Sequence, residues 1–97
     1  MTVGTEPSMT DEIRRVVAEH ARLSVPMAEV ADDDDLYVAG MTSHASVSML
    51  IALEEAFEVE FTEDLLLQST FQSVNAIAAA VKGLLEDKKA AELGPRP

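Results

Sequence analysis

The stretch GMTSHASVSMLIALEEAF, residues 40–57, decides the fold of this chain. A glycine turn leads into Thr42 and Ser43, and apolar residues then recur at helical spacing for about four turns. Residues spaced three and four apart lie on one side of a helix, so one stripe is expected to face a hydrophobic core. That stripe comprises Met49, Leu50, Leu53 and Phe57.

A second apolar set lies beside this stripe. Val47 and Ile51 are four residues apart, and His44, Ser48 and Glu55 continue the same strip. Two interpretations stay open: a wide core-facing stripe, or a helix that packs with one side and offers the other to partners. A hydroxyl in the first helical turn, just beyond a glycine, favours the second. We therefore predict that Val47 and Ile51 are more exposed than the core stripe.

Length and composition predict one small helical domain. The chain has 97 residues, of which 47% are hydrophobic, and aliphatic residues and alanine dominate over aromatic ones. It contains no cysteine, which excludes disulfides and thiolate metal sites. The start lacks a secretory signal and the longest apolar run, 49–53, is far too short to span a membrane. We expect a soluble cytoplasmic protein.

The charge is strongly acidic, with 18 acidic against 7 basic residues. Such a surface repels nucleic acid and anionic membranes, so neither is an expected partner. Basic protein patches would be attracted, although the charge could also serve solubility alone. Arg14 and Arg15 are expected on a solvated face, with pairing to the acidic loop or docking as alternatives.

The elements around the central helix follow from start and stop signals. A first helix is predicted from Thr10 or Asp11, ending before Pro26. The long connection that follows contains the acidic run 32–35, which lacks the ligand spacing of a calcium loop, so no metal site is expected. The inner side of the first helix is expected to comprise Ile13, Val16, Val17 and Leu23, with Ala21 and His20 beside them.

The second half of the chain predicts a short helix and a long one. The short helix starts at Thr62 and includes Leu65, Leu66 and Leu67. Ser69 with Gln72 fits a capping box for the last helix. That helix is expected to run to about Glu86. The fold class is thus all-α, a small four-helix bundle with three longer helices, one short helix and a long first connection. The predicted boundaries are a disordered tail over 1–8, a folded domain over 9–86 and a flexible tail over 87–97.

Ser43 is unsuited to hydrolytic catalysis. A nucleophilic serine needs a base within hydrogen-bond reach, but His44 is its sequence neighbour and therefore points elsewhere on a helix. His20 is the one other histidine, and its spacing predicts a folded-in structural role. No catalytic residues are assigned, and we expect that the chain is not an enzyme. A serine at a helix start can instead carry a phosphodiester, although Ser43 or Thr42 could also be a plain N-cap.

The segment from Asp35 to Val81 resembles the acyl carrier protein family. The resemblance is carried by the acidic loop, Gly40, Ser43 and the run ALEEAF over 52–57. It implies an acyl-carrier type of bundle in which the serine receives 4′-phosphopantetheine from coenzyme A through a phosphopantetheinyl transferase. It further implies that the second helix recognises partners. The matching partner-binding positions are Thr42, His44, Val47, Ser48, Ile51, Glu54 and Glu55.

The usual Asp-Ser-Leu signature of that family is replaced here by Thr42-Ser43-His44. The run GMTSHASV over 40–47 instead resembles the bacterial aminoacyl carrier proteins. This offshoot implies a small amino acid, glycine or alanine, held as a thioester on the arm. An ATP-dependent amino acid:carrier-protein ligase resembling a truncated seryl-tRNA synthetase would load it, and a downstream acceptor of unknown identity would take it.

Two other functions remain as alternatives. A conventional acyl carrier for fatty-acid, specialised-lipid or polyketide synthesis would carry the same arm with a different cargo. An unmodified acidic helical adaptor would bind a basic protein surface and would not need Ser43.

Overall fold

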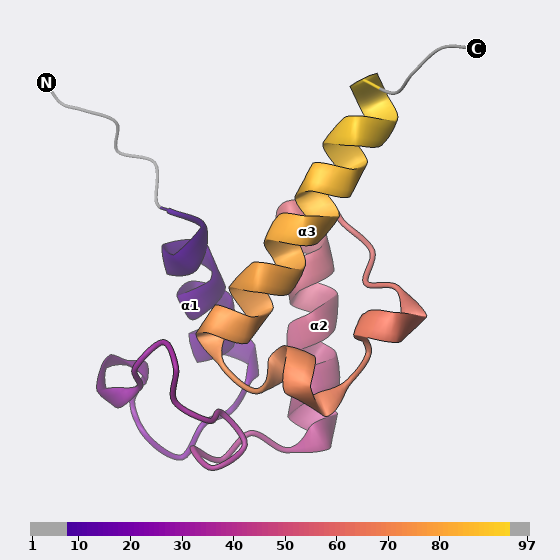
Figure 1. The fold of residues 1–97 in the computed structure, drawn as a ribbon. Helices are drawn as coiled ribbons and strands as arrows, with labels where there is room; N and C mark the ends of the chain where they lie inside the picture. The colour runs from indigo at the N-terminus through magenta and orange to yellow at the C-terminus, as the bar shows by residue number, and fades with distance from the viewer. Residues whose placement is uncertain (1–7, 94–97) are drawn as a thin grey trace, which may run out of the picture.

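The computed structural model describes residues 8–93, which form three α-helices and three short 3-10 turns. The helices are α1 (Met9–His20), α2 (Ser43–Phe57) and α3 (Val74–Leu93), and the turns are η1 (Met27–Glu29), η2 (Glu63–Leu65) and η3 (Gln68–Phe71). The described part of the chain contains no strand. The all-α prediction and the long connection between the first two helices are confirmed (Figure 1).

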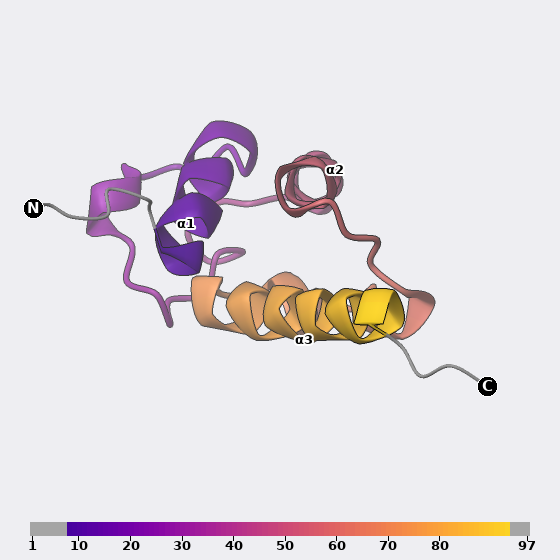
Figure 2. The ribbon, with the colours of Figure 1, turned by 90° about the horizontal axis from the view of Figure 1, so that it is seen from above.

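The core lies where one apolar stripe of each helix meets the others. α1 packs against both α2 and α3, and α1 and α2 lie on the same side of α3 when seen from above (Figure 2). Phe61 and Phe71, from the connection between α2 and α3, add rings whose centroids are 5.4 Å apart. The buried helix positions recur every three or four residues, as burial of one face requires. They are Ile13, Val16 and Val17 in α1, Ala45, Met49 and Leu53 in α2, and Val74, Ile77 and Val81 in α3.

The first helix begins earlier than predicted. Ser8 is its N-cap, and its hydroxyl accepts a hydrogen bond of 3.1 Å from the amide of Asp11. The expected start at Thr10 or Asp11 is therefore wrong, because an equally suitable cap precedes them and places both acidic residues of the first turn at the positive end of the helix. Residues 1–7 of the predicted tail lie outside the described residues.

The link between α2 and α3 differs from the predicted short helix. It contains two separate 3-10 turns, η2 and η3. The predicted capping box is also wrong, because Ser73 rather than Ser69 caps α3 through a bond of 3.0 Å from the amide of Ala76. The Gln72 side chain is engaged elsewhere, donating a hydrogen bond of 3.0 Å to Asp35.

The last helix extends beyond the predicted end at Glu86 and reaches Leu93. Residues 87–93 of the predicted flexible tail are therefore helical. Lys88 explains part of this extension, because its ammonium group donates a hydrogen bond of 2.9 Å to the carbonyl of Glu58, at the C-terminal end of α2. Lysine, alanine and glutamate in this stretch are also good helix formers.

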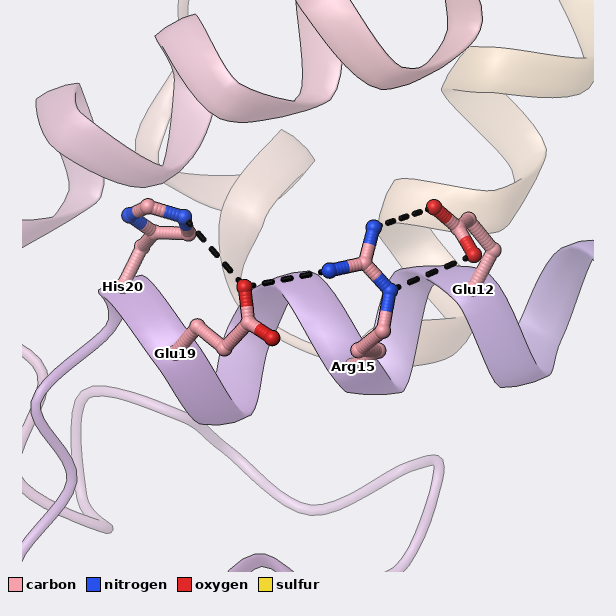
Figure 3. Close-up of polar contacts among 4 residues, drawn as sticks. All are labelled: Glu12, Arg15, Glu19 and His20. Carbon is pink, nitrogen blue, oxygen red and sulfur yellow. Dashed lines mark hydrogen bonds and ion pairs between the residues drawn. The ribbon is translucent and has the colours of Figure 1, made fainter.

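The acidic run of the long connection makes hydrogen bonds that hold the connection in place. Arg14 of α1 donates to the Asp32 carboxylate at 2.8 Å, which confirms the pairing of an arginine with this loop. Asp34 accepts a bond of 2.8 Å from the amide of Ala31. Arg15 does not reach the loop, since it pairs with Glu12 and Glu19 on its own helix (Figure 3).

Asp35 joins the loop to the start of the last helix. Its carboxylate accepts hydrogen bonds from the Gln72 side chain at 3.0 Å and from the amides of Tyr37 and Val38 at 2.8 and 3.2 Å. The Gln72 amide, together with these backbone amides, holds the pKa of the Asp35 carboxyl below its usual range. These bonds tie the loop that leads into α2 to the segment just before α3.

Asp35→Asn is expected to reduce the acid sensitivity of the fold. Because the folded-state pKa of Asp35 lies below an unfolded value of about 3.9, its stabilising contribution is complete above that pH and is lost as the pH falls through the folded-state pKa. Thermal unfolding followed by circular dichroism from about pH 6 to about pH 2.5 should show a shallower acid decline for the variant. Asp33→Asn, at an exposed neighbour, is the control. Indistinguishable profiles for Asp35→Asn and the wild type would contradict this role of the carboxylate.

Candidate functional site

Ser43 is the first residue of α2, and its side chain is exposed. Thr42 is the N-cap, with its hydroxyl accepting a hydrogen bond of 3.0 Å from the amide of Ala45. Of the two hydroxyls that could cap the helix, that of Thr42 therefore does so and that of Ser43 does not. No hydrogen bond within residues 8–93 engages the Ser43 hydroxyl, which therefore remains available for chemistry.

The approach to Ser43 is set by a tight backbone contact. Gly40 has φ of +121°, a conformation that favours glycine, and it lies directly against Ser24. The amide of Ser24 donates to the carbonyl of Ala39 at 2.8 Å, and Met41 is buried immediately afterwards. The chain therefore enters α2 from a fixed direction.

The exposure of the second apolar strip agrees with the prediction. Val47 and Ile51 are 53% and 52% exposed, whereas Met49 and Leu53 are fully buried. Leu50 and Phe57 are half-buried, and His44, Ser48 and Glu55 are exposed beside the strip. The interpretation of one wide core-facing stripe is thereby excluded, and α2 presents a partly apolar face to solvent.

Glu54 differs from the other predicted partner-binding residues. Its side chain is half-buried, and its carboxylate accepts a hydrogen bond of 2.9 Å from the amide of Phe61. The amide of Val59 donates to the Glu54 carbonyl at 3.2 Å. Glu54 thus holds in place the backbone that follows α2. The sequence pattern did not indicate this role.

A cleft of about 320 Å³ opens beside Ser43. The beginning of α2, the long connection and η3 come together at one end of the molecule (Figure 1), and residues from all three line the cleft. The wall formed by Leu66 and Leu67 was not predicted from the sequence. The run of three leucines at 65–67 could have indicated it, because such a run is too apolar for a solvated link. The lining residues are Tyr37, Ser43, Ser46, Val47, Leu50, Leu66, Leu67, Gln68 and Phe71.

The site offers no general base for the serine. No imidazole or carboxylate within residues 8–93 hydrogen-bonds the Ser43 hydroxyl, and the cleft beside it is lined by no histidine, aspartate or glutamate. His20 lies at the end of α1, 3.8 Å from the Glu19 carboxylate, with its side chain 40% exposed (Figure 3). The folded-in role predicted for His20 is wrong, because Val17 and Ala21 occupy the inner side of that helix end.

Residues 8–93 contain no group of three or more histidines and carboxylates placed to hold a metal ion. None of the described helices is long and apolar enough to cross a membrane.

Comparisons with known proteins show the family to which this chain belongs. The sequence model of the family described as "Phosphopantetheine attachment site" matches residues 11–81. The aminoacyl carrier protein of Agrobacterium fabrum (strain C58) is 42% identical over 83 residues, which cover 86% of this chain and all of that protein.

Solved structures give the same result for the fold. A crystal structure of an engineered Bradyrhizobium japonicum glycine:[carrier protein] ligase, complexed with carrier protein from Agrobacterium tumefaciens and AMP, contains a chain with a TM-score of 0.74 and 42% identity. That match covers 76% of this chain and 99% of the other. The solution structure of ATC2521 from A. tumefaciens has a TM-score of 0.69 and 41% identity, covering 84% and 99%. The predicted type of bundle is thereby confirmed.

Proposed function

We propose that this chain, which belongs to the phosphopantetheine-attachment family and within it to the aminoacyl carrier proteins, carries its arm on Ser43 and holds a small amino acid there as a thioester. The observation that supports Ser43 is that the two neighbouring hydroxyls at the start of α2 have different roles. Thr42 caps the helix, so the hydroxyl of Ser43 is exposed and has no hydrogen bond from the described residues. An enzyme that transfers the arm can therefore reach this oxygen without breaking the cap.

The residues at this helix start fit a phosphodiester. The amides of Ser43 and His44 have no acceptor within residues 8–93, whereas the next amide is bonded to Thr42. Free amides at the positive end of a helix stabilise an exposed anion by about 0.3–1 kcal/mol. When bound, the arm supplies a terminal thiol as the attachment point for cargo. The chain itself supplies the anchoring oxygen, the helix end and the surface around them.

The relatives support an amino acid as the cargo. A protein 42% identical to this chain is named an aminoacyl carrier protein, and a carrier of similar identity and fold is seen with a glycine:[carrier protein] ligase. We infer that a phosphopantetheinyl transferase installs the arm and that a separate ATP-dependent ligase loads glycine or alanine. An acceptor of unknown identity would receive the amino acid. The chain would thus be a cytoplasmic carrier that is not itself an enzyme.

The partner-binding surface on α2 is part of this proposal. Thr42 and His44 flank Ser43, while Val47, Ser48 and Ile51 continue along the exposed side of the helix. Glu55 lies exposed farther along the helix, beyond Ile51. Glu54 would contribute through the conformation of the 58–61 link, because its carboxylate is bonded to the backbone there.

Loading of the arm-bearing protein tests the function. The holo protein, given ATP, should gain glycine or alanine from an amino acid:carrier-protein ligase and no acyl chain from an acyl-carrier ligase, as read by intact mass. The unmodified protein is the control and should gain nothing. Acyl loading without amino-acid loading would support the conventional acyl carrier instead and would contradict the proposal.

A further inference from the structure

A separate cleft lies where α1 ends and the long connection begins. It has a volume of about 190 Å³ and is lined by Ala18, Arg22, Leu23, Val25, Pro26 and Met27. Met27 begins η1, and Figures 1 and 2 both show η1, the short purple turn, on the opposite side of α1 from α2. None of the lining residues belongs to α2, so Ser43 and the exposed side of that helix are outside this cleft.

Arg22, one of the lining residues, has a backbone conformation that favours glycine. Its φ is +56°, and it directly follows Ala21, the C-cap of α1. Glycine is the usual residue at this position of a helix end, because a Cβ makes the left-handed conformation less stable. Glu58 is the one other described non-glycine residue with a positive φ, and Lys88 engages both its carbonyl and its carboxylate. A strained residue whose side chain has no such partner is a candidate for a binding role.

The guanidinium group of Arg22 is available to another molecule. It is exposed, and no hydrogen bond or ion pair within residues 8–93 engages it. The two other arginines of the described residues are both paired, Arg14 with Asp32 and Arg15 with carboxylates of its own helix. A guanidinium group binds a carboxylate through two parallel hydrogen bonds, which makes it a suitable contact for an acidic group from a partner.

The wall beside Arg22 is apolar and fixed in position. Val25 is 38% exposed there, and Met27 packs against the core. The Arg14 guanidinium donates a hydrogen bond of 2.9 Å to the Met27 carbonyl, which ties this segment to α1. A preformed apolar cleft beside one cation can hold an apolar side chain next to a carboxylate without first reorganising.

We propose that this cleft docks a protein segment that presents one carboxylate and one apolar side chain on the same side of its backbone. The carboxylate binds the guanidinium group of Arg22, and the apolar side chain lies against Val25 and Met27. A segment with many negative charges, or a nucleic acid, is disfavoured because the net charge of −11 repels it. The docked partner holds the chain from the side of α1 and leaves the start of α2 open.

A capped pentapeptide, acetyl-Ser-Leu-Gly-Glu-Ser-amide, is the probe for this site. Its leucine and glutamate side chains lie on the same side of an extended chain, as the cleft requires. Titrated into the unmodified protein, it should shift the amide NMR signals of residues 22–27 saturably, with a Kd of about 1 mM for so small a contact. Replacing its glutamate by glutamine, or its leucine by serine, should weaken binding at least about five-fold. Absence of saturable shifts at residues 22–27 would overturn the proposal.

Substitution of Arg22 separates binding from folding. Arg22→Gly should weaken binding of the peptide at least about five-fold and should raise the midpoint of thermal unfolding, because glycine adopts a φ of +56° without strain. Lys82→Gln is the control for the lost charge, since Lys82 is an exposed cation of α3 outside the cleft, and it should bind the peptide as the wild type does. Equal binding by Arg22→Gly and the wild type, or a lower unfolding midpoint for Arg22→Gly, would contradict the proposal.

Substitution of Val25 tests the apolar wall. Val25→Ser should weaken binding of the peptide at least about three-fold, because the leucine of the peptide loses its contact. Val38→Ser is the control, since Val38 is 84% exposed but lies outside this cleft. An equal loss of binding in both variants would show that the peptide does not occupy the cleft.

Other occupants of the cleft give different results. Binding of octanoate at residues 22–27, with no binding of the peptide, would identify a site for small apolar carboxylates. Dimerisation of the wild type in sedimentation experiments, lost in Arg22→Gly, would identify a second copy of the chain as the occupant. Either result would overturn the proposal. None of these measurements involves the arm, so their outcome is independent of the proposed function.

Discussion

Ser43→Ala is expected to abolish attachment of the arm completely. The hydroxyl oxygen of Ser43 is the atom that would be esterified, and alanine has none. The unmodified protein, incubated with coenzyme A and a phosphopantetheinyl transferase, should gain one arm mass as wild type and none as Ser43→Ala. Intact mass spectrometry reads both results directly.

The same variant should leave the fold unchanged. The Ser43 hydroxyl makes no hydrogen bond within residues 8–93, whereas Thr42→Ala removes the helix cap and should cost about 1 kcal/mol. Ser69→Ala, at an exposed position in η3 and outside the proposed partner-binding surface, is the control and should accept the arm normally. Attachment to Ser43→Ala, or its loss from Ser69→Ala, would show that the modified hydroxyl lies elsewhere.

Gly40→Ala is expected to produce the largest loss of stability. A Cβ at this position would lie 2.6 Å from the backbone nitrogen of Ser24 and 2.4 Å from its Oγ, so the backbone itself has to move. The φ of +121° adds strain, because residues with a Cβ rarely adopt it. Together these effects should lower the free energy of unfolding by about 3 kcal/mol, as measured by urea denaturation.

Gly83→Ala provides a matched control for this prediction. Gly83 lies within α3, and a Cβ there would meet nothing within 4 Å. Alanine in a helix interior, where its Cβ meets no other atom, should stabilise the protein by about 0.5–1 kcal/mol. Equal stability of Gly40→Ala and the wild type would contradict the tight contact with Ser24 that directs the chain into α2.

The central helix was the most predictable part of the structure. The spacing of Met49 and Leu53 predicted a buried face, and Val47 and Ile51 were predicted to be exposed beside it, as they are. Helical periodicity carries this information because one face of the helix must be buried whatever surrounds it. The importance of Ser43 depended on the resemblance to carrier proteins, because residue type alone cannot distinguish an attachment serine from a cap.

The polar contacts of the loops could be predicted only in part. Pairing of Arg14 with the acidic loop was one of the alternatives and is confirmed, whereas the bond between Asp35 and Gln72, which are 37 residues apart, was not predicted. Partners of this kind are chosen by the path of the chain in space, which no local pattern encodes. The same limit explains the misplaced cap of α3, since Gln72 fitted a capping box but is engaged by Asp35.

The end of the last helix was misjudged for a related reason. Charged residues after Glu86 were interpreted as a tail, but lysine and glutamate are also good helix formers, and Lys88 reaches the end of α2. The exposed leucines at 66 and 67 were assigned to a short helix without regard to their exposure. Their position beside Ser43 became apparent only from the arrangement of the 66–67 segment, η3 and α2 around one cleft.

The most direct measurement is the intact mass of this protein purified from its native host under mildly acidic conditions that preserve thioesters. The account predicts one phosphopantetheine arm on Ser43 and, in a fraction of molecules, the additional mass of glycine or alanine that hydroxylamine removes. Native protein that never carries the arm, or that carries it with a fatty acyl chain in place of an amino acid, would contradict the account.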